Sequence, residues 1–269
     1  MNKVSIQNLA MIVTDYCNLN CEHCLRGCKS NKMMSKEVIE ATFNQLSAIG
    51  NLVLCGGEPT LALDVIEKIF SYISNNKILV NQISTTINGT NFSLEFLGLL
   101  EDISNYIPDN NVMFTISYDT YHQQELERLN MIKKYIENIK KYSKSKYFYG
   151  LRTLEPGLKL FREGNAENLN SDLTINLKPI DIVLTYVGKF SRFDKNGLCN
   201  IGPLMAVNTG GIITEENSSI EHQENLYNYG NVFNDSFEEI ALKRGKIIKP
   251  KQWDRETSKI IKKYVTYNT

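Results

Sequence analysis

The chain has 269 residues, with 30 Lys and Arg against 30 Asp and Glu, so its formal net charge is zero. This balance excludes a strongly basic nucleic-acid binder and a polybasic membrane-surface protein, and we expect neither nucleic acid nor membrane among its partners. With 42% hydrophobic residues, 6 Pro and 16 Gly, the chain can bury a substantial core, which excludes the disordered and collagen-like classes. The apolar run from Leu9 to Val13 is too short for a signal peptide or a membrane span, so we expect a cytoplasmic protein.

Short apolar runs alternate with longer segments of helical period over the first two thirds of the chain. This pattern is typical of βα units that build a parallel sheet, and it predicts an α/β fold. Five strands are expected in this part, at residues 11–14, 52–54, 78–86, 112–117 and 147–153.

Helices are expected between these strands, and Ser35 and Ser93 are candidate caps for two of them. The first helix is expected to end at Gly50, and its apolar face consists of Ile39, Phe43, Leu46 and Ile49. The second has four apolar residues at the spacing of one helix face, namely Ile66, Ile69, Phe70 and Ile73. A long segment with lysines on its outer side, at residues 125–141, predicts a further helix.

The character of the sequence changes in the last third. Further strands are expected at 173–177 and 182–187, and a glycine turn between 204–208 and 212–214 predicts a β-hairpin. We therefore place a domain boundary near residue 195. Residues 243–263 hold nine Lys or Arg and predict a solvated terminal helix, with a partner-binding arm as the alternative.

Four of the six cysteines fall within twelve residues. In a large chain without a secretory signal, clustered cysteines are more often metal ligands or catalytic groups than disulfides. Three thiolates on one loop, Cys17, Cys21 and Cys24, suit an iron–sulfur cluster or zinc. Structural zinc needs four ligands, and Cys28 or His23 could supply the fourth. An iron–sulfur cube on three cysteines leaves one iron open to another ligand.

The spacing Cys17-x3-Cys21-x2-Cys24 after a first strand resembles the signature of the radical S-adenosylmethionine (radical SAM) superfamily. The run Gly-Gly-Glu-Pro at residues 56–59, directly after the second expected strand, is similar to the GGEP motif of the same family. The resemblance implies a [4Fe–4S] cluster on these three cysteines, with SAM chelating the fourth iron. It also implies a partial (β/α)6 TIM-like barrel, with the site at the carboxyl ends of its strands.

By this resemblance, residues 1–195 form the radical SAM core, and residues 196–269 form a small hairpin-plus-helix extension. An electron from a donor such as flavodoxin or ferredoxin enters the cluster, and SAM is cleaved to methionine and a 5′-deoxyadenosyl radical. The radical then abstracts hydrogen from the substrate, while the protein orients the substrate and excludes water.

The resemblance also assigns SAM contacts to the glycine motif. Gly56 and Gly57 allow close backbone approach, and Glu58 can accept a charge-assisted hydrogen bond from the methionyl ammonium group. An ordinary tight turn between strand and helix is the alternative for this motif.

Three further residues are carried over from the family as cofactor contacts. Ser117 and Asp119, at the end of the fourth expected strand, are expected at the SAM ribose, with turn capping as the alternative. His23 occupies the position where the family usually has an aromatic residue whose backbone meets the adenine. His122 is a candidate substrate contact, although a surface histidine at a helix start is the favoured interpretation.

The remaining cysteines have no part in this motif. Cys55 precedes the glycines at the end of a buried strand and is expected to be a small packed thiol, and Cys28 is either a surface thiol or a ligand of another group. The segment from Cys199 to the hairpin and on to 229–240 resembles a SPASM or Twitch domain, with chance hairpin chemistry as the alternative. Since no cysteine follows Cys199, we expect no auxiliary cluster and a role in packing or substrate recognition.

Four functional hypotheses follow. The first is a radical SAM enzyme that modifies a peptide or protein, and the second is one that acts on a small metabolite. RNA modification ranks only third, because the zero net charge and the lack of an evident RNA-binding segment argue against it. The fourth is a non-catalytic zinc-binding or interaction protein that uses the clustered cysteines as ligands.

Overall fold

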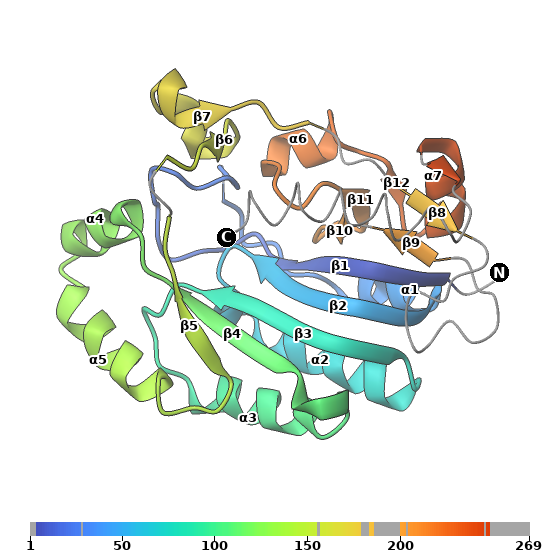
Figure 1. Cartoon of the computed structure of the whole chain (residues 1–269), viewed down its shortest axis with the longest axis horizontal. Helices are drawn as coiled ribbons and strands as arrows, with labels where there is room; N and C mark the ends of the chain where they lie inside the picture. Colours follow the sequence, from blue (N-terminus) through green and yellow to red (C-terminus); the bar gives the residue numbers. More distant parts are fainter. Residues whose placement is uncertain are drawn as a thin grey trace.

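A computed structural model of the chain describes residues 4–27, 29–154, 157–178, 183–185, 200–202, 204–244 and 246–247. A mostly parallel sheet forms the centre of the molecule, and its strands follow the order β12-β11-β10-β1-β2-β3-β4-β5 (Figure 1). The α/β fold class expected from the sequence is therefore confirmed.

Five parallel strands carry the first half of the fold. They are β1 (Val4–Thr14), β2 (Leu46–Gly56), β3 (Leu79–Ile87), β4 (Val112–Ser117) and β5 (Phe148–Arg152). All five expected strands are present, and β1 and β2 are longer than expected. Because the strands are parallel, their carboxyl ends meet at one edge of the sheet, where open α/β sheets bind ligands.

Helices connect these strands and cover one face of the sheet. They are α1 (Lys36–Phe43), α2 (Leu63–Asn75), α3 (Leu94–Ser104), α4 (Thr120–Arg128) and α5 (Ile132–Tyr142). Ser35 and Ser93 cap α1 and α3 as expected, because their side chains accept hydrogen bonds from the N–H groups of Val38 and Phe96. Short 3₁₀ turns, η1 (Pro59–Leu61) and η2 (Pro108–Asn110), precede α2 and β4.

The first helix is shorter than its periodicity predicts. It ends at Phe43, and Leu46 already begins β2, so the expectation that Leu46 and Ile49 lie on the helix was wrong. Ile49 instead pairs with Ile6 of β1 and is fully buried in the sheet. The long-range pairing of two strands therefore overrides a local helical pattern.

The helix expected over 125–141 is divided into α4 and α5. The break lies at Asn130, whose φ of 55° is in the left-handed region. Asparagine tolerates this conformation better than most residues, so it can end one helix before the next begins.

The last third of the chain returns to the same sheet. The hairpin of β10 (Met205–Val207) and β11 (Ile212–Thr214) is antiparallel, as expected, and β10 pairs in parallel with β1. The sixth parallel position of the sheet is thus filled from the C-terminal extension. Shorter elements complete this part: β6 (Leu160–Phe161), η3 (Gly164–Asn168), η4 (Ser171–Leu173), β7 (Thr174–Ile175), β8 (Val183–Thr185), β9 (Asn200–Gly202), α6 (Ile220–Glu224), β12 (Gly230–Asn231), α7 (Phe237–Arg244) and β13 (Lys246–Ile247).

Alternate residues of β1 pack on opposite faces of the sheet. Leu9, Met11 and Val13 belong to the large core beneath the helices, whereas Ala10 and Ile12 pack with Ala206 on the other face. This central strand is therefore buried on both sides, which is typical of a parallel sheet. Among the described residues, no helix is long and apolar enough to cross a membrane.

Candidate active site

The three clustered cysteines lie on the loop that follows β1. Cys21 is buried and Cys17 and Cys24 are half-buried, and all three line one cavity of about 290 Å³. Burial raises the pKa of Cys17 to about 11, and burial together with the neighbouring thiols raises that of Cys21 to about 12. The thiols of Cys17 and Cys21 are therefore protonated at neutral pH until a metal replaces their protons.

Side chains from the end of β3 and from α4 bind this loop. The Asn88 side chain donates to Asn18 Oδ1 over 2.8 Å and lies 3.9 Å from Cys17 Sγ. The Glu125 carboxylate accepts from the backbone N–H of Asn20 over 2.8 Å. The ends of β3 and the helix α4 thus fix the path of the cysteine loop.

The glycine motif lies directly against the chain that leads into the cysteines. The N–H of Gly57 donates to Thr14 O over 2.7 Å, and the N–H of Glu58 donates to Tyr16 O over 2.8 Å. Gly56 has a φ of 144°, and a Cβ built on Gly57 would lie 2.1 Å from Tyr16 O. Only glycine permits this approach, so the two motifs are packed backbone to backbone.

Glu58 lines the cavity and also forms hydrogen bonds within the protein. Its side chain accepts from Thr60 N and Thr60 Oγ1 through one oxygen, and from Asn88 N over 2.7 Å through the other. The residue is 1% exposed, and burial raises the pKa of its carboxyl to about 7. Both oxygens bind the protein and connect the glycine motif to the end of β3. Because Glu58 also lines the cavity, its expected role as an acceptor for an ammonium group stays a prediction.

Ser117 and Asp119 lie where the sequence places them, at the carboxyl end of β4, and both line the cavity. Asp119 Oδ1 accepts from the N–H of His122 and caps α4, while Oδ2 lies 3.4 Å from His23 Nε2. Burial alone would raise the pKa of Asp119, but the hydrogen bond and charge of His23 and the N–H of His122 outweigh it and lower the pKa. Asp119 therefore both caps a helix and presents a carboxylate to the cavity.

His122 is buried, so the expectation of a surface histidine was wrong. It is 2% exposed because the first turn of α4 packs beneath the cysteine loop, and burial lowers its pKa. Its Nε2 lies 2.9 Å from Asn88 O, and Nδ1 lies 3.9 Å from Cys21 Sγ. Since a carbonyl oxygen only accepts, Nε2 carries the proton, and His122 contacts a candidate cluster ligand.

His23 lies on the cysteine loop itself and also lines the cavity. Its ring stacks on Tyr121, with 5.0 Å between the ring centroids, and its Nδ1 has no partner among the described residues. The imidazole and Asp119 therefore form one wall of the cavity.

Sequence reasoning missed two arginines in the cavity wall. Arg152 ends β5 and donates to Thr86 Oγ1 over 3.3 Å, and the rule that ligands bind at strand ends could have indicated it. Arg26 lies 3.7 Å from Cys55 Sγ, and no local signal marks it because its other partners are about 190 residues away along the chain.

Of the other cysteines, only Cys55 lies within the described residues. It packs against the small apolar cluster on the open face of the sheet, as expected, but it also lines the cavity. Burial raises its pKa to about 12. Cys28 and Cys199 lie outside the described residues.

The donor set fits an iron–sulfur cluster with an open iron. Three soft thiols from one loop line a cavity that also contains the glycine motif and the Asp119 carboxylate. The cavity thus has room beside the thiols for a further ligand, as a cube on three cysteines requires.

Comparison with known proteins identifies the family. The sequence model of the radical SAM superfamily matches residues 11–157. The chain belongs to the radical SAM superfamily. It is therefore a radical SAM enzyme, and a [4Fe–4S] cluster and SAM are the cofactors of its family.

Two curated relatives match parts of the chain. An uncharacterized protein of Methanocaldococcus jannaschii is 35% identical over 74 residues, which are 26% of this chain and 26% of that protein. A probable GTP 3′,8-cyclase of Pyrococcus horikoshii is 30% identical over 149 residues, which are 53% of this chain and 44% of that protein. The chain thus spans less than half the length of either relative.

Solved structures show more distant similarity. One is anSMEcpe with bound AdoMet and Cp18Cys peptide, at 15% identity and a TM-score of 0.47, covering 88% of this chain and 80% of that one. Another is Streptococcus suis SuiB bound to precursor peptide SuiA, at 12% identity and a TM-score of 0.40, covering 89% and 65%.

Proposed function

We propose that the chain cleaves SAM reductively at a [4Fe–4S] cluster held by Cys17, Cys21 and Cys24, and that the resulting 5′-deoxyadenosyl radical modifies a peptide or protein. The observation that carries the proposal is the cavity, which brings the three thiols, the glycine motif and Asp119 together at the carboxyl ends of the strands. The cluster, when bound, supplies the electron for cleavage, and an external donor such as flavodoxin or ferredoxin must supply that electron in turn.

Within this proposal, the residues of the cavity orient SAM. The methionyl ammonium group is a donor, and the N–H groups of Gly57 and Glu58 are already bonded to Thr14 and Tyr16. The carbonyl oxygens of the glycine motif are therefore the groups suited to accept from it. Asp119 is the natural acceptor for the ribose hydroxyls, with Ser117 beside it and His23 at the adenine, while Glu58 holds the motif in place.

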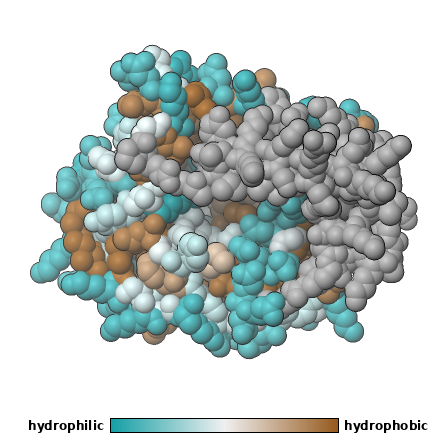
Figure 2. Space-filling view, viewed as in Figure 1, coloured by the Kyte–Doolittle hydropathy of each residue, from teal (hydrophilic) through white to brown (hydrophobic). Residues whose placement is uncertain are grey.

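A peptide substrate is supported by the strand that borders the cavity. In the described part of the chain, β5 pairs only with β4, and the residues that follow it, Thr153 and Leu154, line the cavity. Tyr149 and Leu151 are 75% and 41% exposed, and brown apolar surface lies where β5 is placed (Figure 2). An unpaired strand edge with apolar side chains binds extended backbone, and here it leads directly to the site.

A small metabolite is the second candidate. The name of the Pyrococcus horikoshii relative, a probable GTP 3′,8-cyclase, supports it, as does the lack of any cysteine after Cys199 for an auxiliary cluster. The two candidates differ in what stimulates SAM cleavage. Short precursor peptides encoded beside this gene should increase 5′-deoxyadenosine formation and change in mass if the first is correct, whereas nucleotides or other metabolites should do so if the second is.

The cluster assignment is tested by anaerobic reconstitution with iron and sulfide. The wild type should become brown, bind about four irons per chain and cleave SAM under a reductant. Replacing Cys17, Cys21 and Cys24 together with Ala should abolish the colour, whereas Cys55→Ala should retain it.

Two outcomes would contradict the assignment. Full iron content in the triple variant would point to Cys28, Cys55 and Cys199 as ligands. A colourless zinc protein that is indifferent to SAM would refute the proposed function altogether.

A further inference from the structure

A second set of contacts reaches the cysteine loop from outside the core, from the turn η3. The N–H of Asn165 donates to Cys24 O over 2.9 Å. Its side-chain amide donates to Cys21 O over 2.9 Å and to Asn20 Oδ1 over 3.2 Å. One residue thus binds the backbone of two of the three proposed cluster ligands.

The glycine before Asn165 lies even closer to the same loop. A Cβ on Gly164 would meet Gly27 N at 2.4 Å, Leu25 O at 2.5 Å and Cys24 O at 2.8 Å. The turn η3 and the cysteine loop are therefore in backbone contact, and a shift of one must move the other.

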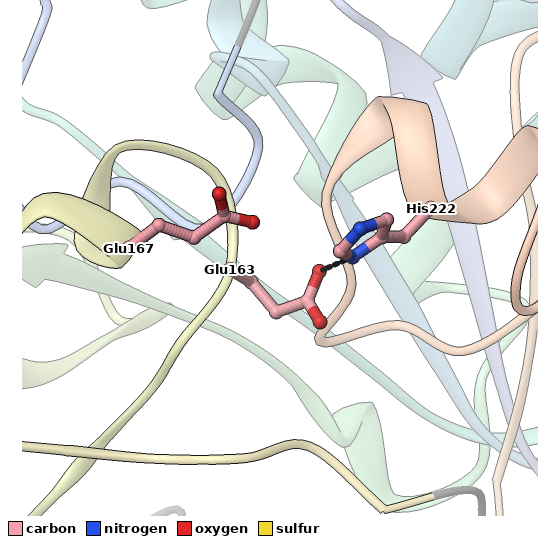
Figure 3. A group of neighbouring side chains, drawn as sticks. All are labelled: Glu163, Glu167 and His222. Atoms are coloured by element: carbon pink, nitrogen blue, oxygen red, sulfur yellow. Dashed lines mark hydrogen bonds and ion pairs between the residues drawn. The ribbon is translucent and has the colours of Figure 1, made fainter.

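Glu163 fixes this turn to the C-terminal extension. One carboxylate oxygen accepts from the N–H of Ser219 and lies 2.8 Å from His222 Nδ1, as Figure 3 shows for the histidine. The side chain of Glu163 is 3% exposed, and these two partners satisfy its buried oxygen. Glu167 lies nearby in Figure 3 without a bond to either residue, and it is exposed.

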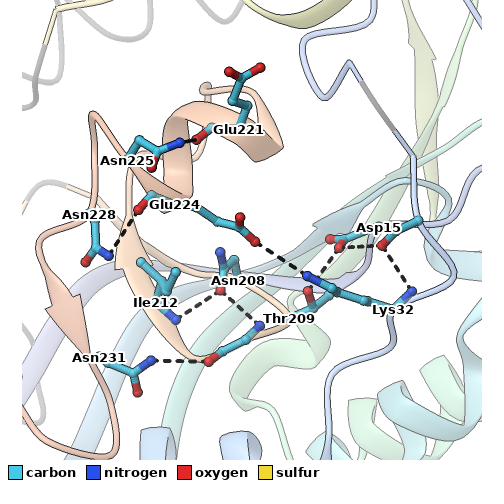
Figure 4. A network of polar contacts seen from close by, with 12 residues as sticks. Asp15, Lys32, Asn208, Thr209, Ile212, Glu221, Glu224, Asn225, Asn228 and Asn231 are labelled. Carbon is cyan, nitrogen blue, oxygen red and sulfur yellow. Dashed lines mark hydrogen bonds and ion pairs between the residues drawn. The ribbon is translucent and has the colours of Figure 1, made fainter.

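The extension also binds the cysteine loop directly. The guanidinium of Arg26 donates to the carbonyl oxygens of Glu216 and Ser218. The backbone carbonyl of Arg26 accepts from the N–H of Ile220. At the start of the loop, the buried Asp15 accepts from Thr209 Oγ1 over 3.1 Å, next to the turn of the β10–β11 hairpin (Figure 4). The loop therefore contacts both the core and the extension.

We propose that Glu163 and Asn165 are positioning residues, through which the C-terminal extension holds the cysteine loop in the conformation that binds the cluster. Ser219 and His222 anchor Glu163, Glu163 places Gly164 and Asn165, and Asn165 orients the peptide groups of Cys21 and Cys24. Groups that orient metal ligands in this way strengthen metal binding without touching the metal. The inference rests on the proposed cluster and gives the extension a task that needs no cysteines of its own.

The test measures the cluster rather than catalysis. Asn165→Ala removes the side-chain bonds to Cys21 and Asn20 and leaves the anchor of Glu163 intact, so its fold should be unchanged by circular dichroism. After anaerobic reconstitution, we expect this variant to lose iron to a chelator about tenfold faster than the wild type. We also expect a broader electron paramagnetic resonance signal from its reduced cluster, because the cysteine loop samples more conformations.

Variants at Glu163 test the anchor. Glu163→Ala should lose iron as fast as Asn165→Ala, and Glu163→Gln should restore part of the lifetime because its amide oxygen can still accept from Ser219. Glu167→Gln is the matched control, since it changes an acid on the same turn whose side chain has no hydrogen bond to Glu163 or His222, and it should behave as the wild type does.

The outcomes distinguish failure of the positioning role from failure of the proposed function. If the wild type binds a cluster, and Asn165→Ala and Glu163→Ala retain its lifetime and its signal, the positioning role is wrong while the proposed function stands. If Glu167→Gln is as impaired as Glu163→Ala, the three side chains of Figure 3 act as a metal site, and positioning is again refuted. A wild type that assembles no cluster refutes both proposals.

Discussion

Gly57 has no room for a methyl group, since a Cβ there would lie 2.1 Å from Tyr16 O and 2.9 Å from Cys17 N. Gly57→Ala must therefore push the glycine motif away from the cysteine loop. Because small displacements of bound groups are costly in catalysis, we expect the rate of SAM cleavage to fall by about 100-fold. The measurement is 5′-deoxyadenosine formation by reconstituted protein under reductant.

Gly98 provides the matched control for this substitution. It lies within α3, and a Cβ built there meets nothing within 4 Å. Gly98→Ala should leave SAM cleavage unchanged and stabilise the fold by about 0.5–1 kcal/mol, because alanine loses less backbone entropy in a helix. Equal cleavage rates in the two variants would show that the close contact at Gly57 is unimportant.

Glu58 predicts a dependence of stability on pH. Burial raises the pKa of its carboxyl from 4.5 to about 7, so between these values the folded protein holds a proton that the unfolded chain has lost. The free energy of unfolding should therefore fall as pH rises through this range, by at most about 3 kcal/mol. In Glu58→Gln this contribution is absent.

Urea unfolding of the metal-free chain at several pH values between about 4.5 and 7 measures the effect. The informative quantity is the difference in slope between wild type and variant, since other groups titrate in both proteins. Parallel curves would show that Glu58 is ionised in the folded protein throughout this range.

Sequence reasoning succeeded for side chains whose partners are close in the chain. The caps Ser35 and Ser93 bind N–H groups three residues ahead, and Asp119 caps α4 in the same way, so local spacing was sufficient. It failed for His122, whose burial depends on the cysteine loop about 100 residues away, and for Arg26, whose partners lie in the extension.

At the scale of single elements, the cap of α3 offers a direct test. The hydroxyl of Ser93 accepts from Phe96 N over 3.0 Å, and this satisfies one of the free N–H groups at the start of the helix. Ser93→Ala should lower the free energy of unfolding by about 1 kcal/mol. Ser71→Ala, at an exposed position within α2, is the control and should change stability by less than about 0.5 kcal/mol.

The boundary between α1 and β2 could not be predicted from the sequence pattern. Apolar residues at helical spacing continue past Phe43, yet the chain pairs with β1 from Leu46 onward. The apolar run at the start of β2 lacks the strict alternation that would distinguish a strand from a helix, so periodicity alone could not place this boundary. The strands β3 and β4 were recognised from their β-branched side chains and from the turn residues that flank them.

At the scale of the whole molecule, the sheet passes across the boundary expected near residue 195. The sequence indicates the β10–β11 hairpin, but nothing local indicates that β10 pairs in parallel with β1 nearly 200 residues earlier. Residues 1–195 and 196–269 therefore share a sheet, and the division into two parts remains a prediction. The same arrangement places the extension next to the cysteine loop, where the hairpin turn contacts Asp15.

A chain that ends at residue 195 should therefore fail to fold on its own. It loses β10, whose Met205, Ala206 and Val207 pair with the buried centre of β1, and it exposes that strand as a sheet edge. It also loses Phe237, which is fully buried and contributes about 2–3 kcal/mol. We expect aggregation and no cooperative thermal transition by circular dichroism, with Phe237→Ala in the full chain as an intermediate case. A monomeric truncated chain that unfolds cooperatively would show that residues 1–195 are an independent domain.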